Sequence, residues 1–546
     1  MTLGSGTGVV TNPEANALIT ALQRPAAYGH PVDRITLLET HISWVLLSGP
    51  YAYKIKKPVI FGFVDFSSLK RRRQFCAEEL RLNQRLAPDL YLDVVPILGP
   101  VAQARFGPPE ALLASSDDPL EDELDAVIEV AVRMRQFDQD DLLPAALERG
   151  AIDGGMIDRL AHDLACFQAR AAIAAPADPY GSPAAVAAPA EANFEALMAV
   201  EALIPRLRPL QDWSRATLAA LAPLLPARRQ AERIREGHGD LHLGNMALLG
   251  GRITVFDALE FNPALRWIDV ISDLAFLVMD LHQSGHPGLG RRLLNRWLES
   301  SGDYEGLRLW RWYEAYRALV RAKVAVLRAI QQGLSPMGDP STAASVERYL
   351  AVAEGLMQPA PQALVLTHGV SGSGKSHHSL QVCKRLGAIR IRSDVERKRL
   401  AGLWGEPRQQ HPQASGPLYG AAMHELLFEQ RLPQLAEAVL AGGFTPIVDA
   451  TFLRRSQRQA WAERARRWGV PLVILEFSAP AELVLQRIAE RSRRGDDPSD
   501  ADAAVVRQQW DSLEPLDSGE RTQAVQVDAT ANPERTAAAV RQRLRV

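Results

Sequence analysis

The stretch Gly369–Ser376 reads GVSGSGKS and directly follows the apolar run Ala363–Leu366. It fits the pattern of a phosphate loop: a glycine, four residues, a glycine, a lysine, and then serine or threonine. The glycines let consecutive backbone N–H groups turn toward a phosphate chain, and the helix that follows presents its positive end. We expect Lys375 to reach the outer phosphates and the Ser376 hydroxyl to bind Mg²⁺.

The strand–loop–helix context favours nucleotide binding over the alternative, a tight turn without function. The predicted nucleotide-binding residues of this loop are Gly369, Val370, Ser371, Gly372, Ser373, Gly374, Lys375 and Ser376.

Strands and helices alternate around this loop. The expected strands are Ala363–Leu366, Ile389–Arg392, Thr445–Val448, Leu472–Phe477 and Ala524–Val527. That alternation predicts a parallel sheet covered by helices on both faces. Residues 358–361, QPAP, form the best linker in the chain, so we expect this α/β domain to cover residues 362–546.

Acidic side chains follow two of these strands. Asp394, in RSDVERK, is placed to orient an acceptor hydroxyl beside the γ-phosphate, and we predict that it is catalytic. Arg392 and Arg397 flank it and would hold an anionic acceptor. Asp449 ends the third strand, where an acidic group near Mg²⁺ is expected; the alternative is a residue that caps the next helix.

Three arginines fall on one face of a later helix. Arg487, Arg491 and Arg494 are spaced at i, i+4 and i+7. We predict that Arg487 and Arg491 belong to a lid that clamps the nucleotide phosphates. A solvated charged face is the alternative.

Composition narrows the class of protein. Of the 546 residues, 47% are hydrophobic and 23% charged, which is typical of a globular protein. The net charge of −2 provides no global attraction to nucleic acid or to an anionic membrane. The three cysteines show no ligand spacing, the N-terminus lacks the features of a signal peptide, and Asp273 and Asp280 interrupt the most apolar run. We therefore expect a cytoplasmic protein with no membrane partner.

The N-terminal part begins with a β-rich section. A helix over Pro13–Leu22 and a strand over Ile35–Glu39 precede a hairpin of two strands, His41–Ser48 and Tyr51–Lys57, joined by a Gly-Pro turn. A long helix from Leu69 to about Leu86 follows, capped by Ser67 or Ser68. The strand pair Leu92–Ile97 and Ala126–Met134 comes next. Beyond it the pattern is mostly helical, with a long surface loop expected over Ala174–Ala190.

A second cluster of polar residues interrupts this helical region. The loop His238–Asn245 reads HGDLHLGN, and the strand after it ends in Asp257. This brings two carboxylates and an amide to neighbouring positions, as phosphoryl transfer requires. One carboxylate orients the acceptor hydroxyl, while the amide oxygen and the second carboxylate hold Mg²⁺. A polar loop with satisfied hydrogen bonds is the alternative.

The segment resembles the catalytic core of the aminoglycoside phosphotransferase and choline kinase superfamily, which shares the protein-kinase fold. The resemblance implies that Asp240 is catalytic and that Asn245 and Asp257 are metal ligands, with Asp273 supporting the loop. A kinase fold also needs a lysine paired with a glutamate. We predict Lys54 and Glu79 for this nucleotide-binding pair, although no GxGxxG precedes Lys54.

The C-terminal motifs resemble P-loop kinases of the gluconate kinase, polynucleotide kinase and zeta-toxin type, which are sometimes grouped loosely with AAA ATPases. The whole chain thus resembles bacterial fusions of the two kinase types. The predicted fold class is α/β and α+β. A flexible start and leading helix over residues 1–30 precede a bilobal kinase-like domain over 31–357, whose lobes are 31–138 and 139–357. The linker 358–361 and a P-loop domain over 362–546 follow.

The resemblance implies ATP and Mg²⁺ at both sites. The preferred hypothesis is therefore a bifunctional phosphotransferase that transfers the γ-phosphate of ATP to hydroxyl groups of small-molecule acceptors. One alternative is a regulatory protein in which the kinase-like domain senses a ligand and the P-loop domain hydrolyses ATP. Another is a nucleic-acid end kinase, which the C-terminal arginines permit but the neutral charge balance does not support.

Overall fold

The computed structural model describes residues 13–40, 42–61, 64–108, 127–405, 417–494 and 498–544. The predicted flexible start, His41 and the side chain of Arg494 lie outside these described residues. The chain divides into two compact units. The first holds residues 1–156, 171–180 and 233–269, and the second holds residues 157–170, 181–232 and 270–546. The P-loop sheet therefore shares a unit with helices that precede it in the chain, and the predicted domain boundaries stay predictions.

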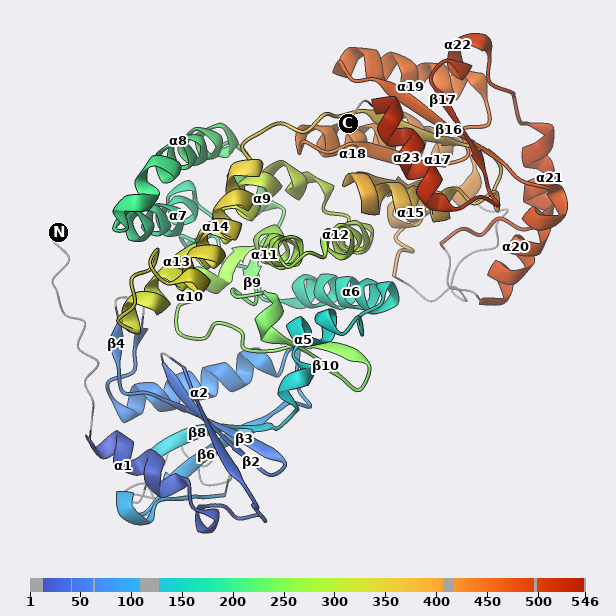
Figure 1. Ribbon diagram of the computed structural model, residues 1–546. Coiled ribbons are helices and arrows are strands. Elements are labelled where there is room, and N and C mark those ends of the chain that lie inside the picture. The colour runs from blue at the N-terminus through green and yellow to red at the C-terminus, as the bar shows by residue number, and fades with distance from the viewer. Residues whose placement is uncertain are drawn as a thin grey trace. The chain divides into compact units, whose positions relative to one another are not determined.

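An antiparallel sheet of six strands forms the core of the first unit, in the order β1-β2-β3-β8-β6-β7 (Figure 1). Its strands are β1 Ile35–Glu39, β2 Ser43–Ser48, β3 Tyr51–Lys56, β6 Tyr91–Leu98, β7 Arg105–Phe106 and β8 Val127–Arg135. The predicted hairpin is β2–β3, in which Val45 pairs with Lys54. Alternation along β3 places Lys54 and Lys56 on the same face of the sheet.

Helix α2 (Leu69–Asn83) packs against β6 and β8 of this sheet. Ser68 is its N-cap, because its hydroxyl accepts a hydrogen bond from the backbone N–H of Arg71 at 3.3 Å. The buried residues of the helix include Cys76, Glu79 and Leu82. The buried carboxylate of Glu79 needs an oppositely charged partner, and the sheet provides the lysines of β3.

Shorter elements complete the first unit. They are α1 Pro13–Leu22, β4 Ile60–Phe61, β5 Val64–Asp65, α5 Leu143–Glu148, β9 Ile234–Glu236, β10 Met246–Leu249, β11 Arg252–Val255, α10 Pro263–Arg266 and β12 Trp267–Asp269. β10 and β11 form an antiparallel hairpin, and β12 pairs with β9. The next helix therefore starts at Val270, because Trp267–Asp269 is taken up in this strand pair.

The second unit begins with a group of helices. They are α6 Gly154–Arg170, α7 Pro183–Met198, α8 Ile204–Leu221, α9 Leu224–Gln230, α11 Val270–Gln283, α12 Pro287–Ser301, α13 Leu307–Gln331 and α14 Pro340–Gly355. Within the described ranges, none of the helices combines the length and the apolar character needed to cross a bilayer.

The surface loop predicted over Ala174–Ala190 is wrong for its second half, where α7 already begins. Ser182 caps this helix by accepting a hydrogen bond from the N–H of Ala185, and Pro183 occupies its first turn, where a proline is tolerated. The helix continues through Pro189, and Phe194 is fully buried against α13. Packing of this apolar face outweighs the proline content that suggested a loop.

A parallel sheet of five strands follows, in the order β14-β15-β13-β16-β17. The strands are β13 Leu364–His368, β14 Ile389–Arg392, β15 Pro446–Asp449, β16 Leu472–Ser478 and β17 Ala524–Asp528, as the sequence predicted within two residues at each end. Its helices are α15 Lys375–Leu386, α16 Ser393–Leu400, α17 Ala421–Glu425, α18 Leu432–Ala441, α19 Arg455–Trp468, α20 Ala481–Arg494, α21 Ala503–Asp511, α22 Ser518–Arg521 and α23 Pro533–Leu544.

Apolar side chains of α15 and α23 share one core cluster with this sheet, while α18 contacts β14 and β15. The strands are covered by helices, and the phosphate loop connects the central strand β13 to α15 (Figure 1). This is the arrangement of a P-loop NTPase domain, as predicted. It brings the carboxyl ends of β13, β14 and β15 to one edge of the sheet.

Candidate functional sites

The first candidate site begins with a cluster of buried charges on β3 and α2. The Nζ atom of Lys54 lies 2.8 Å from Oε1 of Glu79, so the structure brings together the pair predicted from the sequence. Lys56, which the sequence did not single out as a site residue, donates a hydrogen bond to the other carboxylate oxygen of Glu79 at 2.7 Å. One buried carboxylate therefore holds two lysines.

The segment after β11 provides two further carboxylates to these lysines. Lys54 donates to Oδ1 of Asp257 at 2.5 Å, and Lys56 forms an ion pair with Glu260. Glu260 lies three residues after Asp257, within the DALE sequence, and was missed because nothing in the sequence indicates its contact with β3. These two lysine–carboxylate contacts join the N-terminal sheet to the predicted metal-binding segment.

Burial and charge compete in this cluster. Burial alone would raise the pKa of Glu79, but the attraction of Lys54 and Lys56 outweighs it and lowers the pKa to about 2. Burial likewise disfavours the Lys54 cation, yet Asp257 and Glu79 raise its pKa well above its ordinary value. Glu79 and Lys54 are therefore both charged at neutral pH, as a phosphate-binding lysine must be.

The loop between β9 and β10 carries the predicted catalytic aspartate. Gly239 has a φ of +85°, and a Cβ at this position would lie 2.9 Å from the carbonyl oxygen of Leu265, so the turn requires glycine. The backbone N–H of Asp240 donates to Nδ1 of His238 at 3.3 Å, and Nε2 of His238 bonds the carbonyl of Phe256 at 3.0 Å. His238 thereby ties the loop to the segment that leads from β11 to Asp257.

Two side chains contact the Asp240 carboxylate. The amide Nδ2 of Asn245 donates to Oδ2 of Asp240 at 3.1 Å, and Nε2 of His242 lies 3.4 Å from the same oxygen. The Asp240 side chain remains 39% exposed, so an acceptor hydroxyl can reach it. Asp273 belongs to the second unit, where it lies 3.9 Å from Arg317, and its supporting role stays a prediction.

Asn245 and Asp257 lie at the open end of the β10–β11 hairpin. The N–H of Phe256 donates to the carbonyl of Asn245 at 2.9 Å, which places the two predicted metal ligands next to each other in the ladder. Asp257 has a φ of +62°, a strained conformation for a residue other than glycine that often marks a functional site.

These donors fit Mg²⁺. A carboxylate and an amide oxygen are hard ligands, and Mg²⁺ usually combines one or two protein ligands with phosphate oxygens and water. No group of three or more His, Cys, Asp or Glu residues suited to a metal ion occurs in the described part of the chain.

The second candidate site is the phosphate loop after β13. Gly369, Gly372 and Gly374 have φ values of +146°, +82° and +92°, which only glycine adopts easily. The Nζ atom of Lys375 donates to the loop carbonyls of Gly369 at 3.0 Å and Val370 at 2.7 Å. The backbone of the loop therefore holds the Lys375 ammonium through these two hydrogen bonds.

A pocket of about 690 Å³ opens beside this loop. Its lining includes most of the predicted site residues: Ser371, Gly372, Gly374, Lys375, Ser376, Asp394, Asp449, Arg487 and Arg491. Gly369, Val370 and Ser373 belong to the same loop but line a smaller hollow of about 320 Å³. The structure therefore gathers the loop lysine, both aspartates and the two arginines around one cavity.

Three polar atoms of residues that line this pocket are buried without a hydrogen-bond partner among the described residues. They are Oδ2 of Asp449, Nη1 of Arg487 and Nε of Arg397. Such atoms are costly unless a ligand satisfies them. The carboxylate oxygen fits a magnesium ion or its water shell, and the guanidinium nitrogen fits a phosphate. Arg487 is oriented by a hydrogen bond from its Nη2 to the carbonyl of Ala529 at 3.0 Å, and Arg491 donates to the carbonyl of Ala501 at 2.7 Å.

The side of the pocket that carries Asp394 is basic and partly aromatic. Arg392 and Arg397 line it as predicted, and the Arg397 guanidinium lies 5.0 Å from the ring centroid of Tyr419. Burial lowers the pKa of Arg397, while Asp394 acts in the opposite direction. The Tyr419 hydroxyl donates to Asp500 at 2.9 Å.

Tyr419, Asp500 and Gln509 were missed by the sequence analysis. Gln509 accepts a hydrogen bond from the backbone N–H of Ser371 at 2.7 Å, and all three residues line the pocket. They lie far from the motifs in the sequence and have no distinctive pattern, so only the fold brings them to the site.

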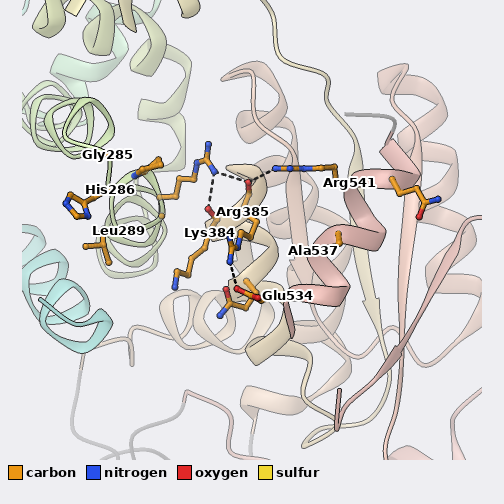
Figure 2. Close-up of a pocket in the computed structure, with 14 residues that line it drawn as sticks. Gly285, His286, Leu289, Lys384, Arg385, Glu534, Ala537 and Arg541 are labelled. Carbon is orange, nitrogen blue, oxygen red and sulfur yellow. Dashed lines mark hydrogen bonds and ion pairs between the residues drawn. The ribbon is translucent and has the colours of Figure 1, made fainter. Parts of the chain in front are cut away.

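A larger hollow of about 990 Å³ lies at the other end of α15, between α12, α15 and α23 (Figure 2). Arg291 of α12 donates to the carbonyls of Lys384 and Arg385 at 3.1 and 2.9 Å, and Arg541 donates to the latter at 3.4 Å. These guanidinium groups satisfy the exposed carbonyls at the end of α15. The positive charge of this hollow therefore has a structural explanation, as a cap on the phosphate-loop helix.

Residues 364–516 match the model of an AAA domain. Two solved structures are similar in part: a choline/ethanolamine kinase family protein from Mesorhizobium loti (13% identity, 63% of this chain and 94% of that one, TM-score 0.37) and a gluconokinase from Sinorhizobium meliloti (21% identity, 34% and 94%, TM-score 0.22). Because both TM-scores are below 0.5, the fold rests on the sheet orders and loop geometry of this chain.

The chain joins a unit built on a six-stranded antiparallel sheet to a P-loop NTPase domain. Over 512 residues it is 30% identical to the "Uncharacterized protein Rv2004c" of Mycobacterium tuberculosis and, to the same extent, to the "Uncharacterized protein Mb2027c" of Mycobacterium bovis. The match covers 91% of this chain and 95% of each relative. The chain belongs to the family of these mycobacterial proteins.

Proposed function

We propose that the protein is a cytoplasmic ATP-dependent phosphotransferase with two Mg²⁺-dependent sites, each transferring the γ-phosphate to the hydroxyl group of a small molecule. The observation that carries the proposal is that each site places a lysine among aspartates, so that the lysine would bind phosphate, one aspartate would take the acceptor and the other would hold a metal ion. These are Lys54, Asp240 and Asp257 at the first site, and Lys375, Asp394 and Asp449 at the second.

At the first site, the Asp240 carboxylate accepts the proton of the acceptor hydroxyl, and Asn245 holds that carboxylate in place. Lys54, oriented by Glu79, would bind the nucleotide phosphates, and Asn245 and Asp257 would hold Mg²⁺. A bound Mg²⁺ neutralises phosphate charge during the transfer.

At the second site, the loop N–H groups and Lys375 bind the phosphates, and Arg487 binds the charge that develops on them. Asp394 orients the acceptor hydroxyl, while Ser376 and Asp449 would hold Mg²⁺. Arg392 and Arg397 favour an acceptor that carries a carboxylate or phosphate group as well as its hydroxyl.

A second candidate is a regulatory protein in which only the P-loop site uses ATP. The contact between Lys54 and Asp257 favours it, because the lysine that would bind phosphate is already engaged by two carboxylates. A nucleic-acid acceptor is less favoured, since the net charge of the chain is −2.

Calorimetric titration of the full chain with a non-hydrolysable ATP analogue and Mg²⁺ tests these proposals. We expect two bound nucleotides per chain, with Lys375→Ala removing one and Lys54→Ala the other. A single nucleotide that only Lys375→Ala removes would support the regulatory protein instead. A screen of hydroxylated acids and sugar phosphates by phosphate transfer from labelled ATP then tests the acceptor class.

A further inference from the structure

We propose that Glu299, at the end of α12, is a positioning residue of the P-loop site. Its carboxylate acts through Arg390 on the carbonyl of Ser376 and lies 4.0 Å from Arg392 on the acceptor side of the pocket. The inference rests on the phosphotransferase activity proposed above for that site. All the residues involved belong to the second compact unit.

The contact between Glu299 and Arg390 is buried and specific. Oε1 of Glu299, a residue only 1% exposed, accepts hydrogen bonds from Nε and Nη2 of Arg390 at 3.0 and 2.7 Å. Its second oxygen accepts a hydrogen bond from Arg296 at 3.2 Å and lies 4.0 Å from Arg392, which lines the pocket. Burial would raise the pKa of Glu299, but these three arginines outweigh it and lower the pKa, so the residue is ionised.

Arg390 carries this contact into the nucleotide site. Its third nitrogen, Nη1, donates to the carbonyl of Ser376 at 2.8 Å. Ser376 is the predicted magnesium ligand, next to Lys375 at the start of α15. A single guanidinium therefore links the carboxylate of α12 to the backbone of the phosphate loop, and its planar shape transmits the orientation of one partner to the other.

The end of α12 also holds the segment that carries Asp394. The carbonyl of Glu299 accepts a hydrogen bond from Arg399 of α16, and the carbonyl of Ser300 accepts one from Trp404 at 3.4 Å. Gly302, with a φ of +70°, ends the helix in close contact with Arg399, where a Cβ would lie 2.8 Å from Nε. The last turn of α12 thus contacts both β14 and α16, the two elements that form the acceptor side of the pocket.

A purely structural ion pair is the alternative explanation, and the same interface offers a matched control. Asn295, one turn earlier on α12, donates to the carbonyl of Ala388 at 3.1 Å and accepts from the N–H of Arg390 at 2.8 Å. It joins the same helix to the same strand, but its hydrogen bonds among the described residues go to backbone atoms and not to the Arg390 guanidinium. Asn295→Ala should loosen the interface without disturbing the connection from Glu299 to Ser376.

The test compares Glu299→Gln, Glu299→Asp and Asn295→Ala in the full chain, with MgATP as the probe. Three quantities are measured: the rate of phosphate release, the KM for ATP and the melting temperature. Only the phosphate release that is lost in Lys375→Ala is counted, because that part belongs to the P-loop site. We expect Glu299→Gln to lower kcat about tenfold while the KM for ATP changes less than about threefold, because misplaced groups affect catalysis more than binding. Glu299→Asp should recover part of kcat, and Asn295→Ala should keep kcat within about twofold even if it melts at a lower temperature.

Two outcomes would overturn the inference. A normal kcat in Glu299→Gln would show that the ion pair is structural. A loss of kcat in Asn295→Ala equal to that in Glu299→Gln, at a similar change in melting temperature, would show that any loosening of the interface has the same effect. If the unmodified chain shows neither ATP binding nor phosphate release that depends on Lys375, the proposed function itself fails, and the inference fails with it.

Discussion

The two candidate sites handle charge in opposite ways. At the first, the cations Lys54 and Lys56 are held between the carboxylates of Glu79, Asp257 and Glu260. At the second, Asp449 and Arg487 each retain a buried polar atom that has no hydrogen-bond partner in the described ranges. The first site therefore pairs its charges internally, with Oε1 of Glu79 held by its ion pair to Lys54, whereas the second leaves polar atoms that a ligand can satisfy.

This difference has a consequence for nucleotide binding. At the first site, a phosphate must compete with Asp257 for Lys54, and the released carboxylate becomes available to a metal ion. ATP and Mg²⁺ should therefore bind there together. At the second site, Lys375 donates to the loop carbonyls of Gly369 and Val370, and the unsatisfied atoms of Asp449 and Arg487 lose their desolvation penalty when a ligand arrives. We expect tighter binding of ATP at the second site.

Asp240→Asn should produce the largest change at the first site. The amide cannot accept the acceptor's proton, so transfer at this site should fall by a factor of about 10² to 10⁴. Nucleotide binding and phosphate release that depend on Lys375 should remain. Turnover by the variant in the background of Lys375→Ala isolates the first site. An equal loss of activity at both sites would mean that the two sites are functionally coupled.

Lys375→Ala should produce the matching change at the second site. Removing the cation that binds the outer phosphates should lower turnover there about 10²-fold. The hydrogen bonds between Asn245 and Asp240 lie in the other unit, so transfer at the first site should persist. Binding of a fluorescent ATP analogue, measured with and without Lys54→Ala, separates the two contributions.

Acid should weaken the second unit before the first. Burial lowers the pKa of His368, at the end of β13, to about 4, so the folded state favours its neutral form. Its contribution to stability is complete above the unfolded pKa of about 6.5 and is lost as the pH falls toward 4, by about 3 kcal/mol in total. In the first unit, the pKa of Glu79 is lowered to about 2, so its contribution to the free energy of unfolding is lost only as the pH falls below about 4.5.

Denaturation of the wild type and of His368→Gln between pH 7 and pH 4.5 measures this effect. The variant should lose less stability than the wild type across this range. Identical pH dependence in the two proteins would contradict the assignment.

Glu260→Gln should give the smallest effect of the series. Lys56 would keep Glu79 as its carboxylate partner but lose the second, and we expect a loss of about 2 kcal/mol in the free energy of unfolding. Glu39→Gln is the matched control, because Glu39 is 60% exposed and pairs with the neighbouring Lys57; its cost should be below about 0.5 kcal/mol. If urea denaturation shows equal losses in the free energy of unfolding for the two variants, burial of the Lys56–Glu260 pair does not add to its contribution to stability.

The sequence alone determined both motifs and most elements. GVSGSGKS specifies its own loop because glycines at positions 369, 372 and 374 adopt positive φ angles that other residues avoid. The repeated order of strand and helix predicted the parallel sheet, a Gly-Pro turn predicted the β2–β3 hairpin, and the spacing of Lys54 and Lys56 placed them on one face of β3. Asp240 and Asn245 are five residues apart, so a single loop brings them into contact.

Only the tertiary structure decided the partners that come from distant segments. Lys56 and Glu260 are 204 residues apart, and Glu299 and Arg390 are 91 apart. No local periodicity connects such pairs, because their contacts depend on how whole elements pack. The same reason explains α7, where buried Phe194 holds a helix in a segment rich in alanine and proline. Local backbone preference determines a phosphate loop, whereas the buried charges that support it are paired only when the chain is folded.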